Sequence, residues 1–195
     1  MTTLIIGGTG FIGRRLIPLL AKQGEDAVVM DINPQTANFS ELAKVRVVRG
    51  DVSQFDDVMA ALTAVKPDRV INLAYYISSD LPPRVAFKLN VLGMDNCFEA
   101  ARLAGCNRVV YASSVAVSGE QKFYGERIVN EDDFKHGHVQ YAMHKIFNEC
   151  RLRPASTLPA WRRCTACGRM QDWRGSRPAR SRCDAASTVS TISGR

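Results

Sequence analysis

Tyr141 and Lys145 are the residues whose types and spacing best suit proton-transfer chemistry in this sequence. They stand four residues apart in segment 140–150, which predicts a helix, so both side chains lie on one helix face. A free tyrosine titrates near pH 10, and acting as a base at pH 7 requires its pKa to fall by about 3 units, which a nearby lysine ammonium favours. Taken alone, such a pair is more often an ordinary pair on a helix surface, so the surrounding elements decide its meaning.

A glycine-rich turn near the start of the chain supplies the first of these elements. Residues 2–7 predict a strand and residues 11–23 a helix, and between them runs Gly7-Gly8-Thr9-Gly10-Phe11-Ile12-Gly13, with G-x-x-G-x-x-G spacing. Such glycines permit a tight turn and close approach of a pyrophosphate, which accepts hydrogen bonds from the helix N-terminus. A glycine triplet alone is a weak signal, but the flanking strand and helix favour a dinucleotide site. The expected cofactor contacts here are Gly7, Gly10, Phe11, Ile12 and Gly13.

Asp31 bears on which dinucleotide would bind. It ends the second predicted strand, eighteen residues after Gly13, where an acidic side chain accepts hydrogen bonds from the adenosine ribose hydroxyls. Its negative charge would repel a 2′-phosphate, so the sequence favours NAD over NADP. Arg14 and Arg15 lie near enough to leave NADP as an alternative.

The rest of the first 150 residues alternates apolar strands with helices. Strands are predicted at 26–31, 44–49, 68–74 and 107–112, and helices at 54–65, 83–104 and 140–150. This alternation is typical of an α/β fold of the Rossmann type, a doubly wound parallel sheet covered on both faces. Such a sheet binds its ligands beyond the carboxyl ends of the strands, which is where the glycine turn and Asp31 fall.

Four further segments carry a resemblance to a known family. They are Gly50-Asp51-Val52, Asn72-Leu73-Ala74-Tyr75, Asn90-Val91-Leu92-Gly93-Met94-Asp95-Asn96 with Glu99-Ala100-Ala101, and Tyr111-Ala112-Ser113-Ser114-Val115. With the glycine turn and the Tyr141/Lys145 pair, they resemble the extended short-chain dehydrogenase/reductase family, of the NAD-dependent epimerase/dehydratase type. The resemblance covers residues 3 to about 149, and Met94 departs from the threonine usual in that family.

The resemblance implies roles for individual residues. Ser114 would hold the substrate oxygen in line with Tyr141, with Ser113 as the close competitor, and Lys145 would also hold the ribose hydroxyls of the cofactor. Further contacts to NAD would come from Asp51, Val52, Leu73, Ala74, Tyr75, Asn90 and Tyr141. The implied function is an NAD-dependent oxidoreductase or epimerase/dehydratase acting at a carbinol or keto carbon of a small molecule such as a nucleotide sugar. The alternative is a dinucleotide-binding module or sensor that does no chemistry.

The composition changes sharply after residue 150. Residues 1–150 hold 16 basic and 17 acidic side chains, whereas residues 151–195 hold ten arginines, no lysine and two acidic residues. No helix or strand is predicted in this tail, and the further strand and substrate domain of the family are not legible there. We therefore predict an NAD-binding domain over 1–150 that is truncated and leaves the fifth strand with an open edge. The tail 151–195 would be disordered or the product of a reading-frame change, unless it is a genuine basic extension.

The remaining features predict no further functional site. Cys164 and Cys167 lack a second ligand pair, so no metal site is predicted, and the tail offers only Trp161 and Trp173 for stacking, which disfavours nucleic acid. No apolar run approaches the roughly 20 residues that span a bilayer, and no leader is evident at the N-terminus. A cytoplasmic protein is expected, with an oligomeric state that the sequence does not indicate.

Overall fold

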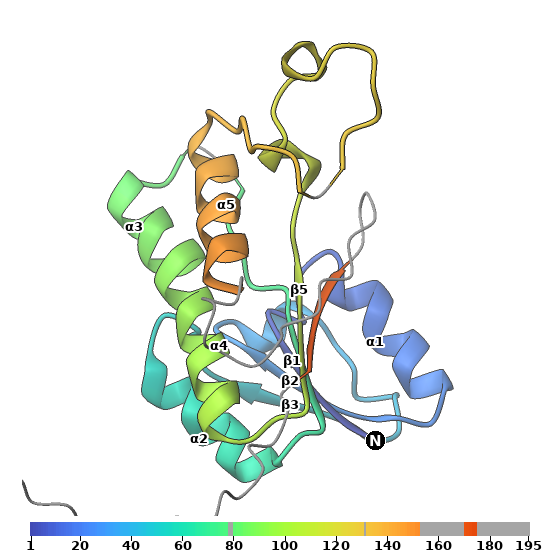
Figure 1. Cartoon of the computed structure of the whole chain (residues 1–195). Coiled ribbons are helices and arrows are strands. Elements are labelled where there is room, and N and C mark those ends of the chain that lie inside the picture. The colour runs from blue at the N-terminus through green and yellow to red at the C-terminus, as the bar shows by residue number, and fades with distance from the viewer. Residues whose placement is uncertain (78–79, 131, 153–169, 175–195) are drawn as a thin grey trace, which may run out of the picture.

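The computed structural model describes residues 1–77, 80–130, 132–152 and 170–174, which form one sheet with helices on both faces (Figure 1). The strands are β1 (Thr2–Ile6), β2 (Asp26–Asp31), β3 (Val45–Arg49), β4 (Arg69–Asn72), β5 (Arg108–Ala112) and β6 (Met170–Arg174). Their order across the sheet is β3-β2-β1-β4-β5-β6. Strands β1 to β5 are parallel, so the segments that follow them all emerge at one edge of the sheet.

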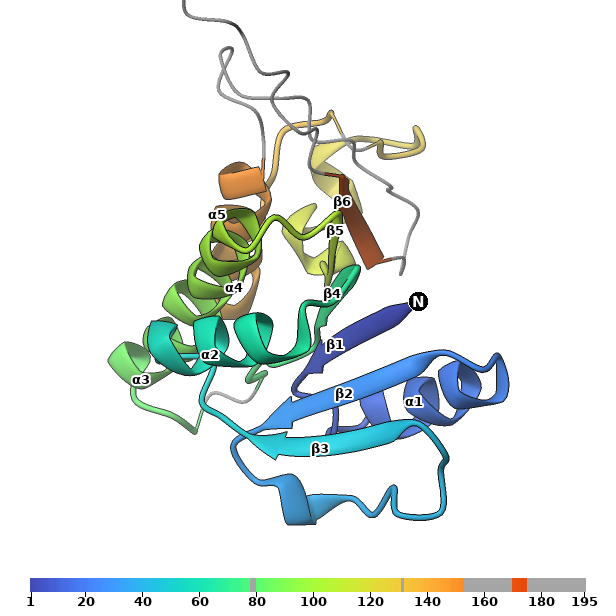
Figure 2. The same cartoon turned by 90° about the horizontal axis from the view of Figure 1, so that it is seen from below.

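The helices cover the two faces unequally. Helix α1 (Gly13–Lys22) lies on one face, and α2 (Phe55–Val65), α4 (Gly93–Leu103) and α5 (Gln140–Leu152) lie on the other (Figure 1 and Figure 2). Alternate residues of a strand belong to two separate hydrophobic cores, one on each face of the sheet. Leu4 and Ile6 pack with α2 and α4, whereas Ile5 packs with Ile17 of α1. Burial on both faces explains why the strand sequences read as nearly continuous apolar runs. The predicted Rossmann-type fold and its first five strands are confirmed.

One predicted helix is divided. The segment 83–104 consists of α3 (Pro83–Phe87), a π-helical turn η2 (Lys88–Leu92) and α4. In the wide turn the carbonyl of Asn90 accepts a hydrogen bond of 3.0 Å from the side-chain amide of Asn148 in α5. In this turn the Asn90 carbonyl therefore forms a hydrogen bond that links the segment to α5.

The prediction that no strand follows residue 150 is wrong. Strand β6 pairs antiparallel with β5, placing Arg174 opposite Arg108 and Met170 opposite Ala112. An edge strand presents unpaired N–H and C=O groups that an extended segment of almost any sequence can satisfy, so pairing here needs no apolar pattern. The predictions about Cys164, Cys167 and Trp161 and most of the basic tail concern residues outside the described part of the chain. Within that part, no helix is long and apolar enough to cross a membrane.

Candidate functional site

The glycine turn brings the end of β1 into close contact with the loop that follows β4. Gly7 has a φ of +74°, and a Cβ atom on it would lie 2.5 Å from the backbone nitrogen of Ala74. A Cβ atom on Gly13 would meet the carbonyl oxygen of Gly8. Both positions therefore require glycine, one for its conformation and close approach and the other for close approach alone.

The N-terminus of α1 has backbone N–H groups that no described residue accepts. Within the described residues, the backbone N–H groups of Phe11, Ile12 and Gly13 have no hydrogen-bond acceptor. The helix has no side-chain cap and no acidic residue in its first turn, which instead carries Arg14 and Arg15. The Phe11 side chain above it is 75% exposed. Unpaired amides at the positive end of a helix dipole fit an anion such as a pyrophosphate.

Asp31 lies beside this turn at the carboxyl end of β2. Its carboxylate accepts the N–H of Thr9 and that of Asn33, both at 3.1 Å. Each carboxylate oxygen keeps a further lone pair, so the group can also accept hydroxyl hydrogen bonds. Arg14 is held by the carbonyls of Thr9 and Thr36, at 2.7 Å each, and does not pair with Asp31.

Arg15 is also bound locally. Its guanidinium lies 3.9 Å from the centre of the Phe11 ring and donates to the Phe11 carbonyl. The two arginines that left NADP open as an alternative are therefore both engaged with the glycine turn or its neighbours.

The predicted adenine-contacting segment follows β3. The N–H of Asp51 donates to Asp57 at 2.8 Å, and the Asp51 carboxylate accepts the N–H of Ser53. Val52 is buried, and its carbonyl accepts a hydrogen bond from the side chain of Asn96. This segment is therefore fixed between α2 and α4 at the same sheet edge as Asp31.

The loop after β4 is held by two asparagines. Asn72 accepts the N–H of Ala74, and Asn90 both accepts the N–H of Tyr76 and donates to its carbonyl, each at 2.8 Å. Asn90 is buried and also lies 3.4 Å from Nδ1 of His144. Its amide is thus bound by protein groups and shapes the loop that carries Leu73, Ala74 and Tyr75.

Tyr141 and Lys145 meet this loop from the first turns of α5. Lys145 is 3% exposed, and its Nζ donates to the carbonyl of Ala112, at the end of β5, at 2.5 Å. Burial lowers the pKa of Lys145 to about 7, and the Glu149 carboxylate acts in the opposite direction. The Nζ lies 5.8 Å from the centre of the Tyr141 ring, so the two side chains share one side of the helix as predicted.

The two serines after β5 have different partners. The Ser113 hydroxyl donates to Glu149 at 2.6 Å, and Glu149 in turn lies 3.9 Å from Nζ of Lys135. The Ser114 hydroxyl oxygen accepts the N–H of Ala116 at 3.2 Å and caps the short turn η3 (Val115–Val117). The Ser113 hydroxyl donates its proton to a carboxylate, whereas no described residue accepts the proton of Ser114. This difference favours Ser114 as the hydroxyl that could meet a substrate oxygen.

Three residues to which the sequence assigns no role contribute to this region. Glu149 stands four residues after Lys145, a spacing that could have identified it on the same helix face. Tyr111 is fully buried beneath Lys145, with its hydroxyl unpartnered among the described residues. His144 is buried against Phe87, and its burial lowers its pKa. No sequence signal identified the last two, because both depend on contacts between distant segments.

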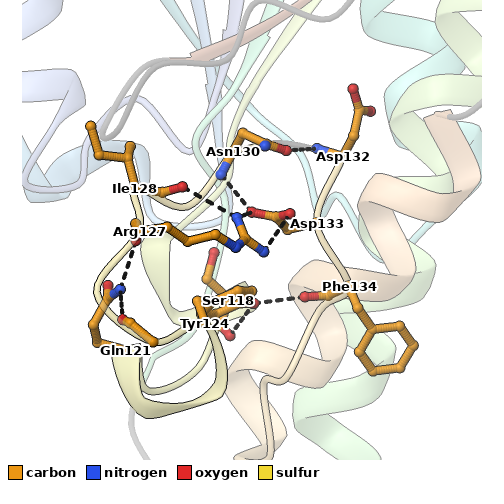
Figure 3. Close-up of polar contacts among 10 residues, drawn as sticks. Ser118, Gln121, Tyr124, Arg127, Ile128, Asn130, Asp132, Asp133 and Phe134 are labelled. Carbon is orange, nitrogen blue, oxygen red and sulfur yellow. Dashed lines mark hydrogen bonds and ion pairs between the residues drawn. The ribbon is translucent and has the colours of Figure 1, made fainter.

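The connection between β5 and α5 folds into a loop braced by hydrogen bonds, shown in Figure 3. The Tyr124 hydroxyl lies 2.7 Å from the carbonyl of Ser118 and 2.6 Å from that of Phe134. Arg127 and Asp133 form a bidentate ion pair at 2.7 and 2.9 Å. These bonds link the described parts of the connection between Ser114 and Tyr141, on either side of residue 131.

These elements define a class of protein: a Rossmann-type sheet with a dinucleotide-type glycine turn and a Tyr/Lys pair at the carboxyl ends of its strands. The chain belongs to the NAD dependent epimerase/dehydratase family, which it matches over residues 3–177. The predicted family is thereby confirmed.

Individual relatives agree with this membership. The chain is 32% identical over 135 residues to a CDP-paratose 2-epimerase of Salmonella typhi, covering 64% of this chain and 40% of that one. It is 27% identical over 181 residues to a UDP-glucose 4-epimerase of Lacticaseibacillus casei, covering 88% and 54%. The structure of a Thermus thermophilus UDP-glucose 4-epimerase in complex with NAD is similar with a TM-score of 0.68 and 29% identity, covering 78% and 50%. The chain thus spans about half the length of these relatives.

Proposed function

We propose that this chain binds NAD across the carboxyl ends of β1 to β5 and uses Tyr141, Lys145 and Ser114 in hydride and proton transfer on a nucleotide sugar. The observation that carries the proposal is the position of Lys145, buried at the end of β5 with Tyr141 one turn before it. The parallel strands bring this pair to the same sheet edge as the glycine turn. The relatives named as nucleotide-sugar epimerases support the substrate class.

The residues present fit NAD. The free amides of Phe11, Ile12 and Gly13 suit the pyrophosphate, and Asp31 suits the adenosine ribose hydroxyls. Asp51 and Val52 would border the adenine, and Leu73, Ala74 and Lys145 the nicotinamide ribose. Bound NAD would supply the group that accepts and returns hydride. The negative charge of Asp31 disfavours the 2′-phosphate of NADP.

The chain's own residues would handle the proton. Tyr141 would take it from, or return it to, the substrate oxygen, and the nearby Lys145 ammonium would favour the phenolate form. Ser114 would hold the same oxygen through its hydroxyl proton, which no residue in the described ranges accepts. Glu149 binds Ser113, which keeps the neighbouring serine out of this role.

The test is turnover of nucleoside diphosphate sugars, including UDP-glucose, by the chain supplied with NAD. Product formation is followed by chromatography and NADH by its absorbance. Tyr141→Phe should abolish turnover and leave NAD binding intact, because the phenyl ring keeps the packing and loses the proton. Tyr76→Phe is the matched control, since Asn90 binds only the backbone of Tyr76. Full activity in Tyr141→Phe would refute the assigned chemistry.

A second candidate is a dinucleotide-binding module without turnover. It is favoured because the amides of residues 11–13, at the start of α1, and Asp31, at the end of β2, lie on other elements than the Tyr/Lys pair of α5. Binding of NAD by the unmodified chain, with no conversion of any nucleotide sugar, would select this function over the first.

A further inference from the structure

The Lys145 ammonium is buried without a direct ion pair among the described residues. Its one hydrogen-bond acceptor there is the Ala112 carbonyl of β5. Glu149, four residues on in α5, is bound instead by Ser113 and approached by Lys135. A buried cation in this position needs another source of negative potential.

Tyr75 supplies that potential from the loop after β4. Lys145 Nζ lies 3.4 Å from the centre of the Tyr75 ring, compared with 5.6 Å for Tyr111 and 5.8 Å for Tyr141. The face of an aromatic ring attracts a cation, and the attraction grows when both are removed from water.

The same side chain also contacts Tyr141. The two rings meet edge to face, with centroids 5.5 Å apart and an interplanar angle of 86°. The Tyr75 hydroxyl donates to the Tyr141 carbonyl at 3.4 Å. Because Asn72 and Asn90 fix the backbone on either side of Tyr75, the ring is presented to α5 by a braced loop.

We propose that Tyr75 is a positioning residue for the Tyr141/Lys145 pair. The face of the Tyr75 ring keeps the Lys145 ammonium charged, and its edge-to-face contact with Tyr141 and its hydroxyl hold the first turn of α5. This role differs from the cofactor contact predicted for Tyr75 from the sequence. It rests on the proposed function only for its effect on turnover.

The expected consequence is a change in the proton affinity of Lys145. The groups that face it are the Ala112 carbonyl and Tyr111 from β5, Tyr75 from the loop, and Tyr141 and Glu149 from its own helix. Burial already lowers the pKa of Lys145 to about 7, so the charge at neutral pH is finely balanced. Removing the ring face should lower this pKa further and leave the lysine mostly uncharged.

The experiment is a pH titration of the Lys145 side chain by NMR, using protein with ¹³C-labelled lysine and assignment by Lys145→Met. Tyr75→Leu keeps apolar volume and removes the ring face, so the pKa of Lys145 should fall by about one unit. Tyr75→Phe keeps the face and should titrate like the unmodified protein. Tyr76→Leu, at the neighbouring position, is the matched control and should also leave the titration unchanged.

Replacing Tyr75 with phenylalanine and then with fluorinated phenylalanines gives a second series, because fluorine weakens the ring potential with little change in shape. The pKa of Lys145 should fall stepwise along it, which a purely structural role would not produce. An unchanged or raised pKa in Tyr75→Leu, or no trend with fluorination, would overturn the proposal. The titration needs no cofactor, so failure to bind NAD would count against the proposed function and not against the role of Tyr75.

Discussion

Lys145 is buried at the place where the proposed chemistry needs a positive charge. It is buried at the end of β5, where its ammonium contacts a carbonyl and an aromatic ring and lacks the solvation it has in the unfolded chain. Burial therefore lowers the pKa of Lys145 to about 7. A lysine that is charged for only part of the time near neutral pH can respond to a bound ligand or to proton transfer at Tyr141.

The first prediction concerns stability and pH. Between the lowered pKa of folded Lys145, about 7, and its higher unfolded value, the unfolded chain binds the proton that the folded chain has lost. The free energy of unfolding contributed by this group therefore rises with pH, by about 2 kcal/mol from pH 6 to pH 8.5. Urea unfolding of the native chain and of Lys145→Met, under reducing conditions, measures it as a difference. An identical pH dependence in the two proteins would contradict the assigned environment of Lys145.

The second prediction concerns Asp31. Its carboxylate both holds the glycine turn through Thr9 and faces the place proposed for the adenosine ribose. Asp31→Ala should narrow the preference for NADH over NADPH, as measured by fluorescence titration with both nucleotides. Asp31→Asn is the matched variant, because it keeps an acceptor for the Thr9 N–H and removes the charge. Tighter binding of NADPH than NADH by the unmodified protein would show that Asp31 is misplaced in this account.

For individual residues, the sequence predicted those contacts that depend on spacing along one helix or strand. The shared helix face of Tyr141 and Lys145 follows from a separation of four residues. The contact of Tyr75 with Lys145 could not be predicted, because it depends on how the loop after β4 packs against α5. The different partners of Ser113 and Ser114 could not be predicted either, because they depend on how α5 packs against the end of β5. Glu149 of α5 binds Ser113.

The segments that connect strands and helices carry most of the residues of the proposed site. The loop between β5 and α5 is closed by Tyr124, whose single hydroxyl proton faces two carbonyl oxygens (Figure 3). The ion pair between Arg127 and Asp133 also links two parts of this loop, and the arginine lowers the pKa of the Asp133 carboxyl. These contacts hold the approach to α5 in one shape.

The third prediction tests this brace. Tyr124→Phe should lower the stability of the chain by about 1 kcal/mol, since a mostly buried hydrogen bond is lost and the ring is retained. Amide hydrogens between Gly119 and His136 should exchange faster, while those of β1 and β4 should not change. Chemical unfolding and hydrogen exchange measure the two effects. Unchanged exchange in the loop would mean that Tyr124 does not hold it.

Regular elements were predictable and irregular ones were not. The five parallel strands follow from apolar runs between glycine, proline and polar residues, and their observed bounds agree with the predicted ones within two residues. The π-helical turn at Asn90 accompanies a hydrogen bond from Asn148, and β6 pairs with the edge of β5. Neither leaves a periodic pattern in the sequence, because backbone groups and single buried amides produce them.

On the scale of the whole molecule, the parallel topology explains why segments distant in the sequence lie at one edge of the sheet. Asp31 ends β2, and the glycine turn, Asp51, the loop at Tyr75 and the two serines directly follow β1, β3, β4 and β5 in that order. All of them lie at one sheet edge. The proposed domain boundary near residue 150 falls within α5, which extends to Leu152. The interpretation of residues 151–195 as a reading-frame product concerns mostly undescribed residues and stays a prediction.

The most direct test of the central claim is a calorimetric titration of the unmodified chain with NADH, in parallel with Gly13→Ala. We expect saturable binding of one NADH per chain. We also expect a large loss of affinity in Gly13→Ala, because the added methyl group meets the Gly8 carbonyl at the turn that would receive the pyrophosphate. Folding of both proteins is verified by circular dichroism. The proposed NAD site would be contradicted if the folded, unmodified chain did not bind NADH, or if a folded Gly13→Ala bound it equally well.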